Sequence, residues 1–299
     1  MKPTILISKC LGFAACRYDG QKIPNSIVDS LKNYVNFITV CPEMGMGLPT
    51  PRKPLSLILN NLIERSSERD FTKKMNDFSI SFLSKINDLD GALFMARSPS
   101  CSIYSAKIHE SDIERHTNGA GLFAKKVKEK FPNIPMEEKG RINNYNIREN
   151  FLTKVFMLKN FKERVSLEDF HKKNKFLLMS FSREIMKELG RLASKNEEKE
   201  YEKELYKIIK KEQTINLMTD VLIHIYGFFK NKISNEEKEF FSNIIKEYRE
   251  ERAPKSEILT LLKDWAIRFK DEYILNQTIF MPYPEELNII TDSGKGRDL

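Results

Sequence analysis

Short apolar runs alternate with amphipathic segments through the first half of the chain. Three runs are apolar and have the length of buried strands: residues 5–7, 37–40 and 92–96. Three stretches between and after them repeat apolar residues at helical spacing: residues 27–36, 71–87 and 121–130. This alternation is typical of βαβ units, and it predicts an α/β domain with a doubly wound parallel sheet.

The pattern changes near residue 150, where strand-like runs stop and helical periodicity with many Lys and Glu residues begins. Breaks are expected near four points, which divide this half into five or six helices: residues 165–166, 196, 234–235 and 253–254. A helix over residues 147–158, rather than a Gly/Ser-rich linker, is expected to join the halves. The sequence therefore predicts an α/β domain at 1–150 and an all-α domain at 151–299.

The composition is that of an ordinary globular protein, with 40% hydrophobic and 31% charged residues among 299. No apolar stretch approaches the ~20 residues of a transmembrane helix, and the start lacks a signal-peptide pattern. We therefore expect a cytoplasmic protein with no membrane partner. Four cysteines are too few for a disulfide framework in a chain of this length. The net charge of +8 permits a polyanionic partner without demanding one.

Three of the four cysteines follow the predicted strands. Cys10 comes after the first strand, Cys41 directly after the second, and Cys101 just beyond the third. The carboxyl ends of parallel strands meet at one edge of a sheet, so these thiolates are expected to converge there. Without a CxxC pair, three scattered thiolates suit an iron-sulfur cluster with one open iron, which can act as a Lewis acid. The alternative for each cysteine taken alone is a small buried hydrophobe.

The segments around these cysteines resemble a known family. The runs CLGFAACRYDG (residues 10–20), CPEMGMGLPTPR (41–52) and RSPSC (97–101) are similar to motifs of the 2-thiouracil desulfidase family. Members of that family carry a 4Fe-4S cluster on three cysteines. The second half, with residues 170–179 and 282–287, looks like the helical domain fused to this module in bacterial tRNA 4-thiouridine desulfidases.

The resemblance implies a role for five residues of the first half. Three would hold a 4Fe-4S cluster and leave one iron open to take the sulfur of a thiocarbonyl: Cys10, Cys41 and Cys101. Glu43 would carry a proton to or from water, and Ser98 would orient or protonate the thiolated base. The alternatives are that Glu43 only caps a turn and that Ser98 only forms one. Cys16 lies outside this ligand set, and both packing and a fourth-ligand role stay open for it.

A basic ridge is expected on one helix spanning about residues 166–193. Its members recur mainly at spacings of three, four or eight residues: Lys172, Lys175, Arg183, Lys187 and Arg191. Such a ridge can follow RNA phosphates, and the resemblance implies tRNA as the partner. Because Glu184 and Glu188 lie beside it, the alternative is an ordinary solvated face.

Together these features predict an iron-sulfur-dependent, non-redox desulfidase that converts 4-thiouridine in tRNA to uridine with release of sulfide. One alternative keeps the chemistry but takes free 2-thiouracil or another small thiolated base. A second alternative is a non-enzymatic RNA-binding protein with a structural metal site. The pattern gives no prediction of the oligomeric state.

Overall fold

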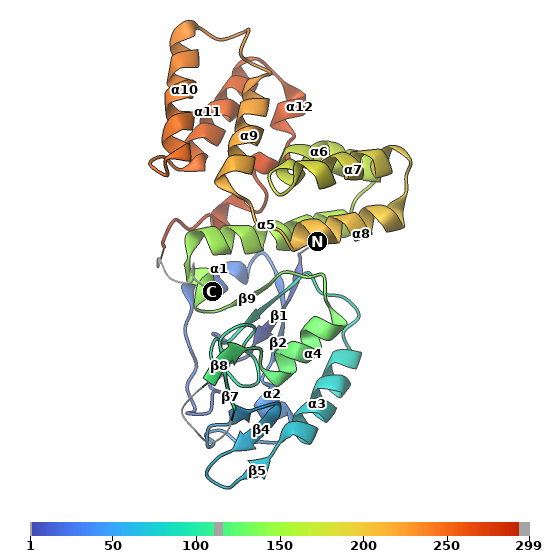
Figure 1. The fold of residues 1–299 in the computed structure, drawn as a ribbon, viewed down its shortest axis with the longest axis vertical. Helices are drawn as coiled ribbons and strands as arrows, with labels where there is room; N and C mark the ends of the chain where they lie inside the picture. Colours follow the sequence, from blue (N-terminus) through green and yellow to red (C-terminus); the bar gives the residue numbers. More distant parts are fainter. Residues whose placement is uncertain (1, 111–115, 293–299) are drawn as a thin grey trace. The chain divides into compact units, whose positions relative to one another are not determined.

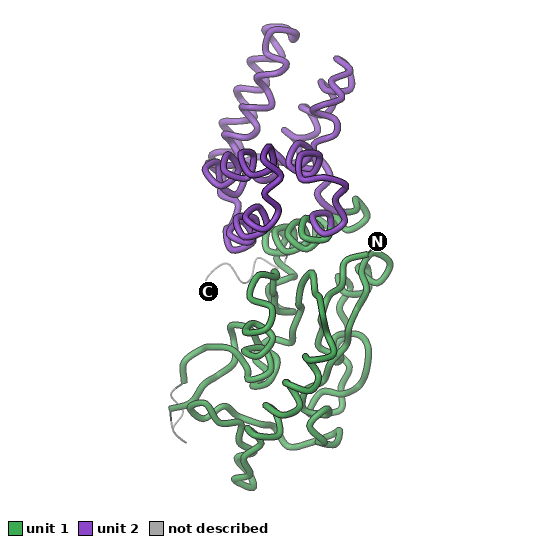
Figure 2. Tube along the Cα trace, turned by 90° about the vertical axis from the view of Figure 1, so that its right-hand side faces the viewer, with its two compact units in different colours: residues 1–159, 284–299 green, residues 160–283 purple. Residues whose placement is uncertain are grey.

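The computed structural model describes residues 2–110 and 116–292, and the chain divides into two compact units (Figure 1, Figure 2). Unit 1 comprises the chain up to Lys159 together with the segment from Pro284, and unit 2 comprises Asn160–Tyr283. The split falls within helix α5 (Tyr145–Lys162), close to the predicted boundary at residue 150. The fold alone does not test the functions expected for the domains 1–150 and 151–299, which stay predictions.

The centre of unit 1 is a four-stranded parallel sheet in the order β2-β1-β6-β9. Its strands are β1 (Thr4–Ser8), β2 (Asn36–Val40), β6 (Gly91–Phe94) and β9 (Met136–Glu138). Strand β1 pairs with β2 along its whole length and with β6 over residues 5–7. The chain moves outward from β1 to β2 and then returns to the other side of β1. Open α/β sheets bind ligands at such a reversal of strand order, outside the carboxyl ends of the strands.

Helices cover both faces of this sheet. Besides α5, the helices of unit 1 are α1 (Ser26–Leu31), α2 (Pro42–Gly45), α3 (Thr72–Ser84) and α4 (Leu122–Lys130). On one face, Ala92 and Phe94 share a core cluster with Phe123 of α4. On the other face, Gly91 lies against Val155 of α5. The predicted α/β fold with a doubly wound parallel sheet, followed by a helical region, is confirmed.

A second sheet, which the sequence pattern did not predict, has the order β5-β4-β3-β7-β8. Its strands are β3 (Ser56–Ile58), β4 (Asn61–Glu64), β5 (Arg69–Asp70), β7 (Ala106–His109) and β8 (His116–Gly119). Strands β3 and β7 are parallel, and the other pairs are antiparallel. Strands of two to four residues are too short to leave a clear alternation of apolar and polar positions.

The segment after Pro284 belongs to unit 1, where Arg148 of α5 fastens it. The guanidinium of Arg148, a residue only 2% exposed, donates hydrogen bonds to the carbonyl oxygens of Ile142, Ile289 and Thr291. Two short 3-10 helices flank this contact, η1 (Arg141–Asn143) and η3 (Glu285–Leu287). A buried arginine thus joins the end of the described chain to the first half of the sequence.

Unit 2 is helical throughout its regular elements. These are α6 (Leu167–Met179), α7 (Arg183–Ser194), α8 (Glu198–Ile209), α9 (Ile215–Tyr226), α10 (Asn235–Arg249), α11 (Lys255–Arg268), α12 (Glu272–Leu275) and η2 (Thr278–Phe280). None of the helices that the structure describes is long and apolar enough to cross a bilayer.

The single helix expected over residues 166–193 is wrong, because the chain turns between α6 and α7. At this turn the hydroxyl of Ser182 caps α7 by accepting a hydrogen bond from the N–H of Ile185, while Phe181 is buried. A serine that satisfies the first N–H groups of a new helix can end the preceding one even where the apolar spacing continues.

Candidate active site

All four cysteines form one group at the carboxyl edge of the parallel sheet. Cys10 follows β1, Cys41 follows β2 and precedes α2, and Cys101 lies in the loop after β6. Sγ of Cys41 donates a hydrogen bond to the carbonyl oxygen of Cys16 at 3.5 Å, and the thiols of Cys10 and Cys41 both lie close enough to the Cys16 thiol to change its pKa. Cys101 lies close enough to Cys41 for their charges to interact. The structure therefore brings together the three cysteines expected to converge, and it places Cys16 among them.

The surroundings of these thiols favour their protonated form. The hydrogen bond with Cys10, together with burial, raises the pKa of Cys16. The hydrogen bond with Cys16 and burial raise the pKa of Cys41, and burial raises that of Cys101. A bound metal reverses this preference, because coordination holds a thiol as the thiolate.

The donor set is the one that iron-sulfur clusters use, since the converging groups are thiols. Within residues 2–110 and 116–292, no three or more Cys, His, Asp and Glu side chains are arranged around a single metal ion. A four-iron cluster attaches its thiolates to different iron atoms, so its ligands need not surround one point. By the chemistry of the donors, this group of thiols fits an iron-sulfur cluster.

Glu43 is a buried carboxylate beside the thiols. It lies in the first turn of α2, two residues after Cys41, and is 8% exposed. Its Oε2 accepts a hydrogen bond from Nε of Arg52 at 2.6 Å, and its Oε1 accepts one from the hydroxyl of Ser100 at 2.8 Å. Both oxygens are thus directed toward other loops of the site, and the buried charge is paired as burial requires.

Arg52 connects Glu43 to the loops that carry the cysteines. Its Nη1 donates to the carbonyl oxygen of Cys16 at 3.1 Å and to Oγ1 of Thr50 at 3.2 Å. Its Nη2 lies 3.9 Å from Sγ of Cys41. This guanidinium places one fixed positive charge beside both the carboxylate and the thiols.

Ser98 sits in the loop that leads to Cys101. Its Oγ accepts hydrogen bonds from the N–H groups of Ser100 at 3.3 Å and Cys101 at 3.1 Å, and its side chain also contacts the Cys101 thiol. The two backbone N–H groups fix the oxygen, and the hydroxyl keeps one proton to donate, which the Cys101 sulfur can accept. Arg97, just before it, has a left-handed backbone (φ 60°), and its N–H donates to Oγ of Ser105 at 2.9 Å.

Gly121 supports the same loop from outside. A Cβ at Gly121 would lie 2.5 Å from the carbonyl carbon of Ser100 and 2.8 Å from the carbonyl oxygen of Pro99. The N–H of Gly121 donates to the carbonyl oxygen of Ser102 at 2.8 Å, and that of Leu122 donates to Pro99 at 3.0 Å. Helix α4 therefore starts in direct backbone contact with the loop, and glycine permits that approach.

A second buried carboxylate, Glu138 at the end of β9, was missed by the sequence analysis. It accepts five hydrogen bonds of 2.5–3.1 Å from the loop after Cys101: Ser102 Oγ, Ile103 N, Tyr104 N, Ser105 N and Ser105 Oγ. Burial opposes its charge, but the hydrogen bonds from Ser102 and Ser105 outweigh burial and lower the pKa of Glu138. Strand β9 reads Met-Glu-Glu and contains no apolar run, so the sequence offered little signal for it.

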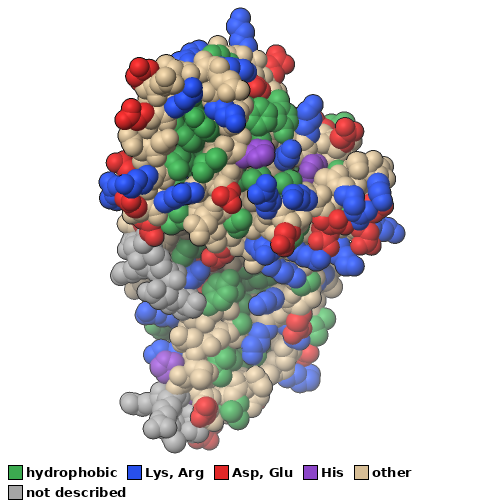
Figure 3. All heavy atoms as spheres, turned by 45° about the horizontal axis from the view of Figure 1, so that its top comes forward, with side chains coloured by type: hydrophobic (Ala, Val, Ile, Leu, Met, Phe, Trp, Pro, Cys, Tyr) green, Lys and Arg blue, Asp and Glu red, His purple; other side chains and the backbone are tan. Residues whose placement is uncertain are grey.

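The five basic residues expected to bind RNA lie on two helices of unit 2 instead of one ridge. Lys172 and Lys175 belong to α6, while Arg183, Lys187 and Arg191 belong to α7. Arg191 pairs with Glu188, with 3.0 Å between Nε and Oε2. Lys175 and Arg183 both act electrostatically on His224 of α9. Figure 3 shows many Lys and Arg side chains spread over the helical unit, with Asp and Glu side chains among them.

Comparisons with known proteins match the two halves of the chain to two different families. Residues 5–139 match the family model described as 2-thiouracil desulfurase, and residues 175–284 match DUF1722, a family of unknown function. The uncharacterized protein YbbK of Bacillus subtilis (strain 168) is 27% identical, over 42% of this chain and 89% of its own length. A solved structure of the 4Fe-4S-dependent thiouracil desulfidase TudS is 26% identical and covers 47% of this chain and 93% of that chain, with a TM-score of 0.39.

The protein therefore carries a 2-thiouracil desulfurase-like module, joined to a DUF1722 region. The match of the first module points to a desulfidase of thiolated pyrimidines. The group of thiols, Glu43 and Ser98 all lie within the matched residues 5–139.

Proposed function

We propose that the protein is an iron-sulfur-dependent desulfidase that replaces the sulfur of 4-thiouridine in tRNA by oxygen. The observation that carries the proposal is the buried group of thiols with Glu43 and Ser98 beside it. In this reaction water adds its oxygen to the ring carbon, the carbon–sulfur bond breaks and sulfide leaves, with no net transfer of electrons. The reaction needs a group that moves protons for water and a soft acceptor for sulfur.

Cys10, Cys41 and Cys101 would hold a 4Fe-4S cluster through their thiolates, with Cys16 as a further thiol in the same group. When bound, the cluster supplies a Lewis acid with affinity for sulfur. The nearby positive charge of Arg52 helps the chain to hold thiolates and a carboxylate in one buried place.

Glu43 is the residue that we assign to the water. A carboxylate offers about four lone-pair sites, and Arg52 and Ser100 occupy two of those on Glu43. The free sites can hold a water and accept its proton, while the two fixed contacts orient the carboxylate. Ser98 would donate its hydroxyl proton toward the thiolated base, since two backbone N–H groups fix its oxygen.

The choice of tRNA over a free base rests on unit 2. A small base needs no additional helical region, whereas the basic side chains of α6 and α7 suit a polyanion. The alternative substrate is free 2-thiouracil, because the family that matches residues 5–139 is described by that compound.

The test is anaerobic reconstitution with iron and sulfide, followed by incubation with tRNA that contains 4-thiouridine. We expect the near-ultraviolet band of 4-thiouridine to disappear and sulfide to accumulate in equal amount. A cluster-loaded protein that leaves the band unchanged refutes the proposal. Faster turnover of free 2-thiouracil than of thiolated tRNA would favour the alternative substrate. Zinc without iron in anaerobically purified protein would contradict both.

A matched pair of variants tests the role of Glu43. The change Glu43→Gln should retain iron and lower turnover by roughly 10²–10⁴-fold, the range for a removed general base. The control is Glu64→Gln, which removes another buried carboxylate paired with an arginine, Arg69, on the second sheet. Loss of iron in Glu43→Gln alone would give Glu43 a structural role instead.

A further inference from the structure

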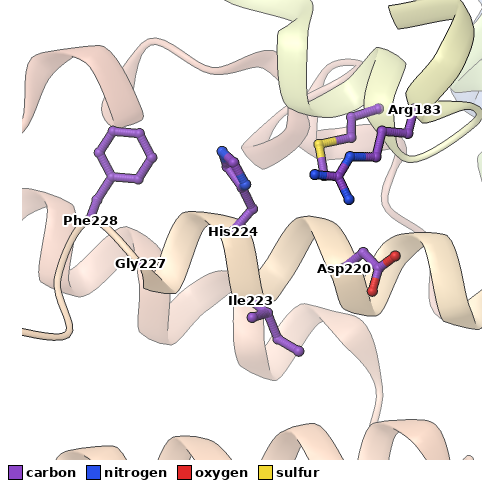
Figure 4. A pocket seen from close by; sticks show the side chains of 7 residues that line it. Arg183, Asp220, Ile223, His224, Gly227 and Phe228 are labelled. Atoms are coloured by element: carbon purple, nitrogen blue, oxygen red, sulfur yellow. The ribbon is translucent and has the colours of Figure 1, made fainter. Parts of the chain in front are cut away.

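Unit 2 contains an open pocket of about 550 Å³ along α9. One side follows the helix and the turn after it with helical spacing: Asp220, Ile223, His224, Gly227 and Phe228. Met179 and Arg183, from the end of α6 and the start of α7, form the opposite side. Figure 4 shows Arg183 directed toward the helix near Asp220, with His224 and Phe228 farther along.

The Phe228 end of the pocket is aromatic. The ring of Phe228 is 38% exposed and rests on buried Phe176 and on Tyr273, at centroid distances of 6.1 and 5.9 Å. The ring of His224 lies 6.4 Å away. Because Phe176 and Tyr273 already restrict the Phe228 ring, the ring loses little conformational entropy when a flat ligand in the pocket stacks on it. By contrast, Phe240 of α10 is 56% exposed, and no ring contact is found for it within the described residues.

The other end of the pocket is cationic. Arg183 lines the pocket, whereas Lys175 is not one of its lining residues. Burial and the charges of Lys175 and Arg183 lower the pKa of His224. Among the residues that the structure describes, the guanidinium of Arg183 has no hydrogen bond and no paired carboxylate. Asp220 is the acidic residue of the lining. Arg183 is the cation of the lining, and a guanidinium without a carboxylate partner can bind a phosphate in a bidentate manner.

We infer that this pocket binds one unpaired nucleotide of an RNA strand, with the base stacked on Phe228 and the adjoining phosphate at Arg183. The combination of a stacking ring and an unpaired guanidinium is one that proteins use to bind single-stranded nucleic acids. The carboxylate of Asp220 can accept a hydrogen bond from an amino group on the edge of a base. The volume lies within the ~300–1,000 Å³ of ordinary ligand pockets. The inference rests on the proposed function in taking RNA as the substrate class.

Stacking can be observed directly by placing a tryptophan in the pocket. The chain has one tryptophan, Trp265, which is 1% exposed. In Phe228→Trp, a short single-stranded oligouridylate should quench the fluorescence of the introduced tryptophan, and an RNA duplex should quench it much less. The matched control Phe240→Trp should be quenched little by either RNA. Equal quenching of both variants, or of neither, overturns the inference.

Binding of the same fluorescein-labelled oligouridylate to the full chain separates stacking from charge. The change Phe228→Ala should weaken binding roughly 5- to 150-fold, the equivalent of one lost stacked base, without changing the salt dependence. The change Arg183→Gln should reduce the slope of log affinity against log salt by roughly 0.7, the value for one phosphate on a single strand. The control Lys199→Gln removes an exposed charge from α8, away from the lining residues, and should leave the affinity nearly unchanged.

These measurements use unmodified RNA, so they do not depend on the cluster or on desulfidation. If the wild-type protein desulfidates thiolated tRNA but Phe228→Ala and Arg183→Gln bind RNA like Lys199→Gln, the pocket is not a nucleotide site and the proposed function stands. If the wild-type protein binds no RNA and processes only free thiouracil, both proposals fail. If the variants lose binding while the wild-type protein acts only on the free base, the pocket is an RNA site and only the substrate assignment fails.

Discussion

The loop that carries Cys101 depends on the charge of Glu138, and the change Glu138→Gln tests this dependence. Glutamine keeps the shape of the side chain and removes its charge. Hydrogen bonds to a charged group contribute about 1.5–3 kcal/mol, compared with about 0.5–1.5 kcal/mol between neutral groups. Each of the three backbone donors, Ile103, Tyr104 and Ser105, should therefore lose about 1 kcal/mol. We expect the loop to be destabilised by about 3 kcal/mol in total.

Hydrogen–deuterium exchange of the peptide covering residues 98–110 measures this loss where it occurs. If the loop opens locally, about 3 kcal/mol corresponds to roughly 100-fold faster exchange of the three N–H groups. The neighbouring change Glu137→Gln is the matched control. Glu137 is also buried, but its carboxylate accepts hydrogen bonds from Arg141 and from the N–H of Glu138 and none from this loop. Equal exchange in Glu138→Gln and Glu137→Gln would refute the assignment of loop stability to Glu138.

The difference in loop exchange rate between Glu138→Gln and the wild-type protein should also depend on pH. Because the pKa of Glu138 is lower in the folded protein than its ordinary value of 4.5, the unfolded state binds the proton more readily. The stabilisation is therefore complete above about 4.5 and lost as the pH falls through the lower folded-state pKa. Exchange of the two proteins at the same pH should converge at the acid end. A difference that stays constant with pH would indicate altered packing instead of lost charge.

Two further perturbations test other parts of the chain. The change Gly121→Ala should destabilise unit 1 by about 1–3 kcal/mol and lower iron retention, because its Cβ would meet the backbone of Ser100. In the control Gly140→Ala, the new Cβ meets nothing within 4 Å, so stability and iron retention should both stay unchanged. Thermal unfolding and iron assays measure the two effects. In unit 2, burial and the charge of Lys175 lower the pKa of His171 from 6.5 to about 4. Protonation of His171 should therefore lower the free energy of unfolding of unit 2 by up to about 3 kcal/mol as the pH falls from 6.5 to about 4. The loss should be smaller in His171→Gln. Urea unfolding followed by Trp265 fluorescence measures both losses, and equal losses would contradict the prediction.

The long elements of the fold could be predicted because each buries enough apolar surface to leave a periodic pattern. The runs before Cys10, Cys41 and Cys101 became β1, β2 and β6, and the helices expected over 71–87 and 121–130 became α3 and α4. The second sheet gave no such pattern, because its strands are short and are held by pairing between distant segments.

The convergence of Cys10, Cys41 and Cys101 could be predicted because strand direction alone brings the carboxyl ends of parallel strands together. The partners of Glu43 could not be predicted in the same way. Its contact with Ser100 joins residues 57 positions apart through the geometry of two loops. The contacts of Glu138 likewise span more than thirty positions, and no local spacing encodes them. The role of Cys16 could not be predicted, because its distance from the other thiols depends on how the loop after Cys10 folds back.

Two buried carboxylates flank the loop between Ser98 and Ser105, and their hydrogen bonds suit them to different tasks. Glu138 accepts five hydrogen bonds, four at Oε1 and one at Oε2. All five donors belong to the loop after Cys101, and the lowered pKa of Glu138 keeps it charged, so it is a structural anion. Glu43 accepts two hydrogen bonds and keeps about two sites free. The proposed proton transfer to or from water is therefore assigned to Glu43, whose contact with Ser100 ties its position to the loop that Glu138 holds in place.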